Sequence, residues 1–104
     1  IYSLDVVEHI KPELEDILFK NIILSLKDNG ICIIGMPSLE SQRYASEKSK
    51  AGHINCKNGE ILKKDLKKYF RNVFLFAMND EIIHTGFTPM SHYNIALCVT
   101  PIRD

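Results

Sequence analysis

The feature that most constrains the fold of this chain is a continuous apolar run, ICIIGMP, from Ile31 to Pro37. A strand with one face in water would alternate apolar and polar residues, whereas this run contains no charged side chain. Continuous apolar strands are typical of parallel sheets that helices cover on both faces. We therefore expect an α/β fold in which helices lie on both sides of this strand.

Strand and helix patterns alternate on either side of this run. The expected elements are a strand over 1–4, a helix over 12–27, a helix over 59–70, and strands over 72–78 and 93–100. Pro12 suits a first helical position, where its missing N–H is not needed, and Asn29-Gly30 suits a helix end. Strand–helix–strand connections make neighbouring strands parallel. The last strand follows its predecessor without a helix, so it should run antiparallel.

Three polar segments follow the carboxyl ends of the predicted parallel strands, at 4–10, 38–58 and 80–92. In open α/β sheets, ligands bind outside these strand ends. The three segments contain all four histidines of the chain, which are His9, His53, His84 and His92. Their position favours a functional role at this rim of the sheet.

Composition excludes several classes of protein. Thirteen basic and thirteen acidic residues give zero net charge, which argues against nucleic-acid binding by bulk charge. No apolar run approaches the ~20 residues of a membrane span. Cys32, Cys56 and Cys98 show no CxxC spacing, so we expect free thiols and a cytoplasmic location.

The segments SLDVVEHI and LKDNGICIIGMPS, with the helix between them, resemble the second half of class I S-adenosylmethionine-dependent methyltransferases. The fourth strand of that family often ends in a hydrophobic-acid-x-x-Glu-His pattern, matched here by Leu4, Asp5, Glu8 and His9. The fifth is often preceded by Leu-Lys-x-x-Gly and ends in x-Pro, matched by Leu26, Lys27, Gly30 and Met36-Pro37.

This resemblance implies a partial Rossmann-like methyltransferase sheet, made of the family's last four strands with flanking helices. The expected order is strand one, strand two, last strand, third strand, with the last antiparallel between its neighbours. Residues 1–104 would be the C-terminal half of one domain, and the N-terminal cofactor-binding half would be absent, because no Gly-rich turn is present. The chain alone is then expected to be inactive.

The resemblance also implies S-adenosylmethionine as cofactor and O-methylation of a small molecule or glycan as the reaction. Leu4 and Asp5 would lie beside the cofactor, with the Leu4 backbone against its methionine part. In ubiquinone-biosynthesis and small-RNA O-methyltransferases a similar motif binds a divalent metal, which would assign Asp5, Glu8, His9 and His53 as ligands. Such a metal could lower the pKa of an acceptor hydroxyl. The alternative is that Glu8 and His9 only orient the loop and cap the helix at Pro12.

His53, His84 and His92 are candidate catalytic bases, since imidazole titrates near neutral pH. Arg43 and Tyr44 could contact an anionic or aromatic acceptor. Because neighbouring parallel strands lie about 4.8 Å apart, His53 should approach the turn that carries Glu8 and His9.

Two other functions remain open. One is a non-enzymatic module that forms a homodimer through the exposed edge of the strand at 1–4, which carries no Pro or Lys to block pairing. The other is a metal-dependent RNA 2′-O-methyltransferase, although the chain has no long basic tract.

Overall fold

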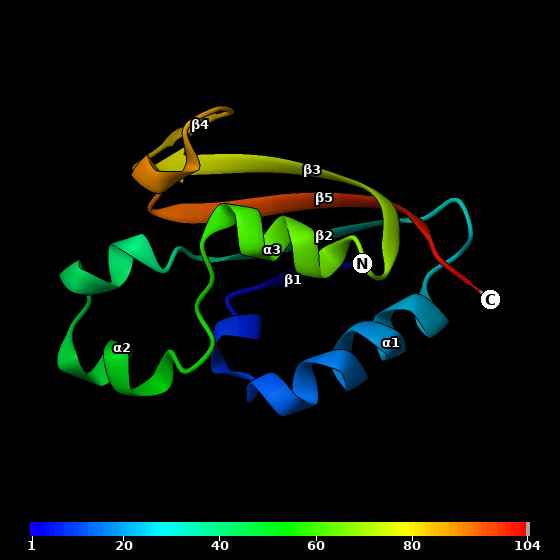
Figure 1. Ribbon diagram of the computed structural model, residues 1–104, viewed down its shortest axis with the longest axis horizontal. Coiled ribbons are helices and arrows are strands. Elements are labelled where there is room, and N and C mark those ends of the chain that lie inside the picture. The colour runs from blue at the N-terminus through cyan, green and yellow to red at the C-terminus, as the bar shows by residue number, and fades with distance from the viewer. Residues whose placement is uncertain (104) are drawn as a thin grey trace.

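The computed structural model describes residues 1–103 and contains a five-stranded mixed sheet (Figure 1). The strands are β1 (Tyr2–Leu4), β2 (Ile31–Pro37), β3 (Phe70–Asn79), β4 (Ile82–His84) and β5 (Tyr93–Pro101). Their order is β1-β2-β5-β3-β4, with β1 parallel to β2 and β5 antiparallel to both β2 and β3. The four predicted strands correspond to β1, β2, β3 and β5. Their predicted order, β1-β2-β5-β3, and the antiparallel direction of β5 are confirmed.

Three α-helices and four 3₁₀ turns connect the strands. The helices are α1 (Glu15–Ser25), α2 (Glu47–Gly52) and α3 (Gly59–Leu66), and the turns are Val7–His9, Pro12–Leu14, Glu40–Tyr44 and Thr88–Met90. Pro12 opens the turn before α1, as expected. The Asn58 side chain caps α3 by accepting the Ile61 N–H at 2.9 Å. The helix predicted over 59–70 is shorter than expected, because Phe70 already begins β3.

The hydrophobic core lies between the sheet and helices α1 and α3. From the helices it contains Phe19, Ile22, Ile23, Leu62 and Leu66, and from the strands Cys32, Ile34, Met36, Val73, Ala96 and Cys98. Cys32 and Cys98 face each other across β2 and β5 and are buried free thiols, as predicted. Every second residue of the central strands therefore points toward the helices and is buried against them.

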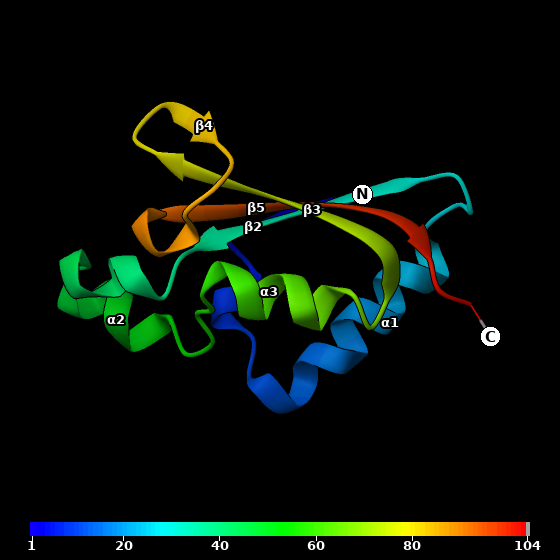
Figure 2. The same ribbon diagram turned by 45° about the horizontal axis from the view of Figure 1, so that its top comes forward.

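The prediction that helices cover both faces of β2 is wrong for the described residues. Figure 2 shows α1 and α3 on the same side of the sheet. The two crossovers, from β1 to β2 and from β2 to β3, both step in the same direction across the sheet. Right-handed connections then put both helices on one face.

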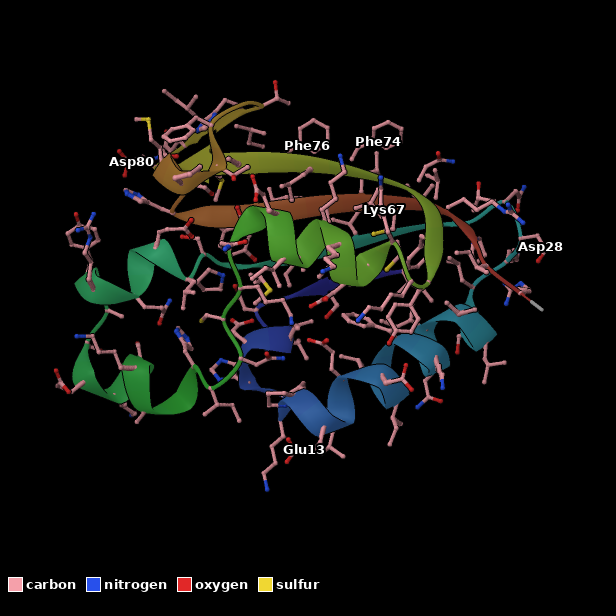
Figure 3. All side chains as sticks on the ribbon, viewed as in Figure 1. Glu13, Asp28, Lys67, Phe74, Phe76 and Asp80 are labelled. Carbon is pink, nitrogen blue, oxygen red and sulfur yellow. The ribbon has the colours of Figure 1, made fainter. Side chains whose placement is uncertain are left out.

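The opposite face, which we call the bare face, is apolar and open to solvent. The pairing places Ile33, Leu97 and Phe74 side by side on it, and Phe74 is 52% exposed. Phe74 and Phe76 point away from the helices in Figure 3. The outer edge of β1 has no strand partner within residues 1–103. The apolar pattern of the strands thus reflects a face that nothing in the described chain covers.

The two long segments at the rim contain structure that the sequence did not indicate. The first holds the Glu40–Tyr44 turn and α2, and the second folds back as β4, with Asp80 in the left-handed region at a φ of 50°. No helix in residues 1–103 is long and apolar enough to cross a membrane.

Candidate functional site

Glu8, His9 and His53 come together at the carboxyl ends of β1 and β2, and we call them the rim cluster. Each offers one possible ligand atom, and these atoms all lie within 4.8 Å of one another. The His9 and His53 ring centroids are 5.0 Å apart. The Asn55 N–H donates to the Glu8 carbonyl at 3.0 Å, which holds the segment after α2 against the turn after β1. The predicted approach of His53 to this turn is confirmed.

Both imidazoles are oriented by hydrogen bonds from Nδ1. His9 Nδ1 lies 2.7 Å from the Gly52 carbonyl oxygen, and His53 Nδ1 lies 2.9 Å from Gln42 Oε1. Gln42 Nε2 donates to the Ser38 carbonyl at 3.3 Å, which leaves its oxygen for His53. Because these oxygens only accept, Nδ1 carries the proton and the neutral rings present a lone pair on Nε2.

Glu8 is the buried member of the rim cluster and is only 1% exposed. Burial raises the pKa of its carboxyl, and the charge of Asp5 adds to that rise, although His9 and His53 oppose it. Oε2 lies 3.8 Å from His9 Nε2, and Oε1 has no hydrogen-bond partner among residues 1–103. A buried acceptor without a donor is costly. The cluster therefore presents one carboxylate and two imidazole lone pairs to a cation or a proton.

Asp5 does not join the rim cluster in the described structure. Its backbone is left-handed, with a φ of 61°, and its N–H donates to the Gly35 carbonyl at 2.9 Å. Its carboxylate lies near the Tyr93 hydroxyl, and burial together with this negative charge raises the pKa of Tyr93. The turn thus separates the two acids that the sequence pairs, and Asp5 lies beside Leu4 and Gly35 instead.

Gly35 permits the close packing at the end of β1. A Cβ atom there would lie 2.7 Å from Leu4 Cδ2 and 2.8 Å from the Tyr93 hydroxyl. Neither distance is tolerable for a side chain, so glycine lets Leu4 and Tyr93 close over β2.

Of the other two candidate histidines, only His92 lies near His53. His84 is in β4, where its Nε2 is hydrogen-bonded to Asn79 Oδ1 at 3.0 Å. His92 lies edge-on to Tyr44, with ring centroids 6.2 Å apart. A hollow of about 320 Å³ is lined by both His53 and His92, together with Pro37, Gln42, Tyr44 and Ser49.

A buried hydroxyl and amide network that the sequence did not reveal fixes His92. Ser38 Oγ donates to the Ser91 carbonyl at 2.5 Å, and the Ser38 N–H donates to the His92 carbonyl at 3.0 Å. Ser91 Oγ lies 2.8 Å from Asn94 Oδ1. All three polar side chains of this network, Ser38, Ser91 and Asn94, are at most 1% exposed. The network ties the end of β2 to the start of β5 and so joins the two rim segments.

Lys57 joins the first rim segment to helices α1 and α3, a role that the sequence did not indicate. Its ammonium lies 3.0 Å from Glu15 Oε1 and 2.7 Å from Asp65 Oδ2, and the residue is only 9% exposed. These two carboxylates raise the pKa of Lys57 although burial opposes them. Asn55 also donates to Glu15, at 2.9 Å. A lysine in a polar segment carries no sequence signal for such a role.

Comparisons of the chain with protein-family models, with curated proteins and with solved structures find no match. The case for a function therefore rests on the rim residues and on the arrangement of the sheet.

Proposed function

We propose that this chain is the acceptor-binding half of an S-adenosylmethionine-dependent methyltransferase that acts on a hydroxyl group of a small molecule or glycan. The observation that carries the proposal is the rim cluster, in which Glu8, His9 and His53 meet at the carboxyl end of β1. This is the edge at which open α/β sheets bind their ligands. The strand order expected from the methyltransferase resemblance is a second support.

The chemistry of methyl transfer fits the groups at the rim. The reaction is an in-line displacement, so the protein mainly positions the acceptor oxygen and manages its proton. His53 Nε2 can accept that proton, because Nδ1 is already occupied by Gln42. The hollow beside His53 leaves room for the acceptor.

The rim cluster also fits a divalent metal, because the unpartnered Glu8 oxygen and the two Nε2 lone pairs are ligand types that metals accept. Glu8, His9 and His53 would hold the ion. A bound divalent metal would lower the pKa of the acceptor hydroxyl. Asp5, which contacts Tyr93, would instead lie on the cofactor side of the turn with Leu4.

The bare face and the free edge of β1 are where a cofactor-binding half would dock. In a doubly wound sheet, strands added beyond the first one run outward in the opposite direction. Right-handed crossovers then place their helices on the other face. A half of this kind would pair with β1, and its helices would cover the part of the bare face next to β1, which accounts for the apolar character of that edge.

Metal binding can be tested on the chain itself by NMR. Titration with Mn²⁺ should broaden amide signals around 7–9 and 52–54, and Zn²⁺ or Mg²⁺ should shift the same signals. Glu8→Gln and His53→Ala should remove these effects. His84→Ala is the matched control, because His84 lies outside the rim cluster. Broadening that is scattered over exposed acids, or unchanged in both variants, would contradict a metal at the rim.

Methyl transfer is tested in a protein that joins this chain to a nucleoside-binding half. Loss of activity with Glu8→Gln, with His53→Ala and with EDTA, restored by Mg²⁺, Mn²⁺ or Zn²⁺, supports the metal. Loss with both variants but not with EDTA, and no metal by elemental analysis, supports proton transfer by the cluster alone. Full activity of both variants would remove the rim cluster from catalysis.

The bare face also favours a second candidate function, a homodimerisation module. Exposed apolar faces of this kind mark interaction surfaces, and an unpaired strand edge is a template for pairing. Sedimentation of the chain distinguishes the two: a stable dimer that Phe74→Asp disrupts favours the module, and a monomer at all concentrations opposes it.

A further inference from the structure

A divided cleft lies between the two rim segments, next to the rim cluster. Its inner hollow, of about 320 Å³, touches His53, and its outer hollow, of about 240 Å³, does not. Tyr44 and His92 line both hollows and form the wall between them. Small-molecule sites occupy roughly 300–1,000 Å³, so the inner hollow lies at the lower limit of this range, and the two hollows together suit one ring compound with a substituent.

The outer hollow carries one carboxylate and one guanidinium. Glu40 and Arg43 both line it and belong to the same 3₁₀ turn, Glu40–Tyr44. Residues three apart in a 3₁₀ helix lie on one side, which brings both charges to this wall. Within residues 1–103 neither side chain has an ion pair or a hydrogen bond, although the Arg43 guanidinium lies over the Tyr44 ring, and one Glu40 oxygen is buried without a partner. A strong acceptor and a fork of donors are therefore both free for a ligand.

The wall between the hollows is aromatic and largely open. Tyr44 is 72% exposed, and the Arg43 guanidinium lies 5.1 Å from its ring centroid. An exposed ring offers a flat apolar surface, and the guanidinium that lies over one face of the ring supplies donors beside that surface.

We propose that the outer hollow binds a pyranose ring, which makes the methyl acceptor of the proposed function a sugar or glycan. The apolar C–H face of the sugar lies on Tyr44, and adjacent ring hydroxyls donate to Glu40 and accept from Arg43. A further hydroxyl of the same sugar passes His92 into the inner hollow and reaches His53. This inference rests on the proposed function only for that last step.

Charge selects the sugar over other small ligands. An anion such as phosphate would be attracted by Arg43 but repelled by Glu40. An amine would be attracted by Glu40 but repelled by Arg43. A neutral ligand with donors and acceptors on adjacent carbons satisfies both groups at once. A zwitterion such as an amino acid is the remaining competitor, and the experiment separates it.

The test is NMR titration of the chain with methyl β-D-glucopyranoside, methyl α-D-mannopyranoside and methyl β-D-galactopyranoside, beside glycine and inorganic phosphate. At least one pyranoside should shift signals of Arg43, Tyr44 and His92. Glu40→Gln and Tyr44→Ala should each weaken its binding about tenfold, the scale of one lost hydrogen bond to a charged group for Glu40 and of one lost stacking contact for Tyr44. Glu47→Gln is the matched control, since the Glu47 side chain is 96% exposed outside the cleft.

Three results would overturn the inference: no shift with any pyranoside, equal binding by Glu40→Gln and the unchanged chain, or tighter binding of glycine or phosphate. Glu8→Gln separates this inference from the proposed function, because Glu8 lines neither hollow. Pyranoside binding should survive that substitution while metal binding is lost. Pyranoside binding in a chain that binds no metal would keep the sugar site and remove the metal from the proposed function.

Discussion

Replacing Glu8 by glutamine should stabilise the metal-free chain and abolish its response to metal. The Glu8 carboxylate is 1% exposed, and its Oε1 has no hydrogen-bond partner among residues 1–103. Residues placed to bind a ligand commonly reduce the stability of the fold that carries them. Glutamine keeps the shape of the side chain and removes the buried charge.

The size of the effect follows from the missing partner. A buried polar group without a partner costs about 1–3 kcal/mol, and more when charged. Glutamine still buries a polar oxygen, so Glu8→Gln should raise the free energy of unfolding at neutral pH by about 1–2 kcal/mol. For a domain of this size each kcal/mol corresponds to about 4–8 °C in Tm.

The pH dependence has a definite sign. The folded-state pKa of Glu8 is raised above its ordinary value of 4.5, mainly by burial. Below that ordinary value the carboxyl is protonated in both folded and unfolded chains, and the variant should gain nothing. The gap opens as the pH rises above 4.5 and is complete above the raised folded-state pKa.

Thermal and urea unfolding followed by circular dichroism, first in EDTA and then with Zn²⁺ or Mn²⁺, measures both effects. Metal at a hundred times its Kd should stabilise the unchanged chain by about 2.7 kcal/mol and leave the variant unaffected. Glu81→Gln, at an exposed position, is the control and should match the unchanged chain. A variant that is less stable in EDTA would refute the reasoning, since it would mean that the Glu8 charge has a favourable partner.

Three other outcomes are expected. Calorimetry should detect no appreciable binding of S-adenosylmethionine by the chain alone, and tight binding would contradict the assignment as half of a site. Lys57→Met should lower the free energy of unfolding by about 3 kcal/mol, because Glu15 and Asp65 lose their counter-charge, whereas exposed Lys64→Met should change it by less than about 0.5 kcal/mol. Equal losses in urea unfolding would count against that ion pair. Phe74→Thr should change stability by less than about 1 kcal/mol, because Phe74 is half exposed, and should reduce the fluorescence of a hydrophobic dye. Undiminished dye binding would argue that the bare face is not where the dye binds.

The sheet was predictable where the sequence carries local signals. Gly30 and Pro37 bound the apolar run that predicts β2, and the apolar run from Tyr93 predicts the start of β5; both agree with the structure. The prediction that helices cover both faces of the sheet was wrong, because α1 and α3 lie on the same face. An apolar strand shows that both its sides carry apolar side chains, but it does not show whether helices of the same chain cover both sides, and here the handedness of two crossovers puts both helices on one side.

The rim was predictable in part for a similar reason. Topology alone brings His53 to Glu8 and His9, because both segments leave neighbouring parallel strands at the same edge. Asp5 is separated from Glu8 because its own backbone is left-handed. That conformation accompanies the close packing of Leu4 and Tyr93 against Gly35, which the sequence does not reveal. The Ser38–Ser91 contact and the Lys57–Glu15 ion pair join residues far apart in sequence, and only the folded chain reveals them.

The central place of β5 has a consequence for how the protein forms during synthesis. β5 is the last strand of the described chain, yet it lies between β2 and β3 and pairs with both along most of its length. While a ribosome still holds residues 93–101, neither of those strands has β5 as its neighbour, and only the separate β1–β2 and β3–β4 pairs can form. The two pairs can therefore join into one sheet only after residues 93–101 have left the ribosome, in a step that joins distant parts of the chain. Folding that depends on such distant contacts is slow. A ribosome that stalls before Tyr93 would release a chain in which β2 and β3 each keep one unpaired, aggregation-prone edge.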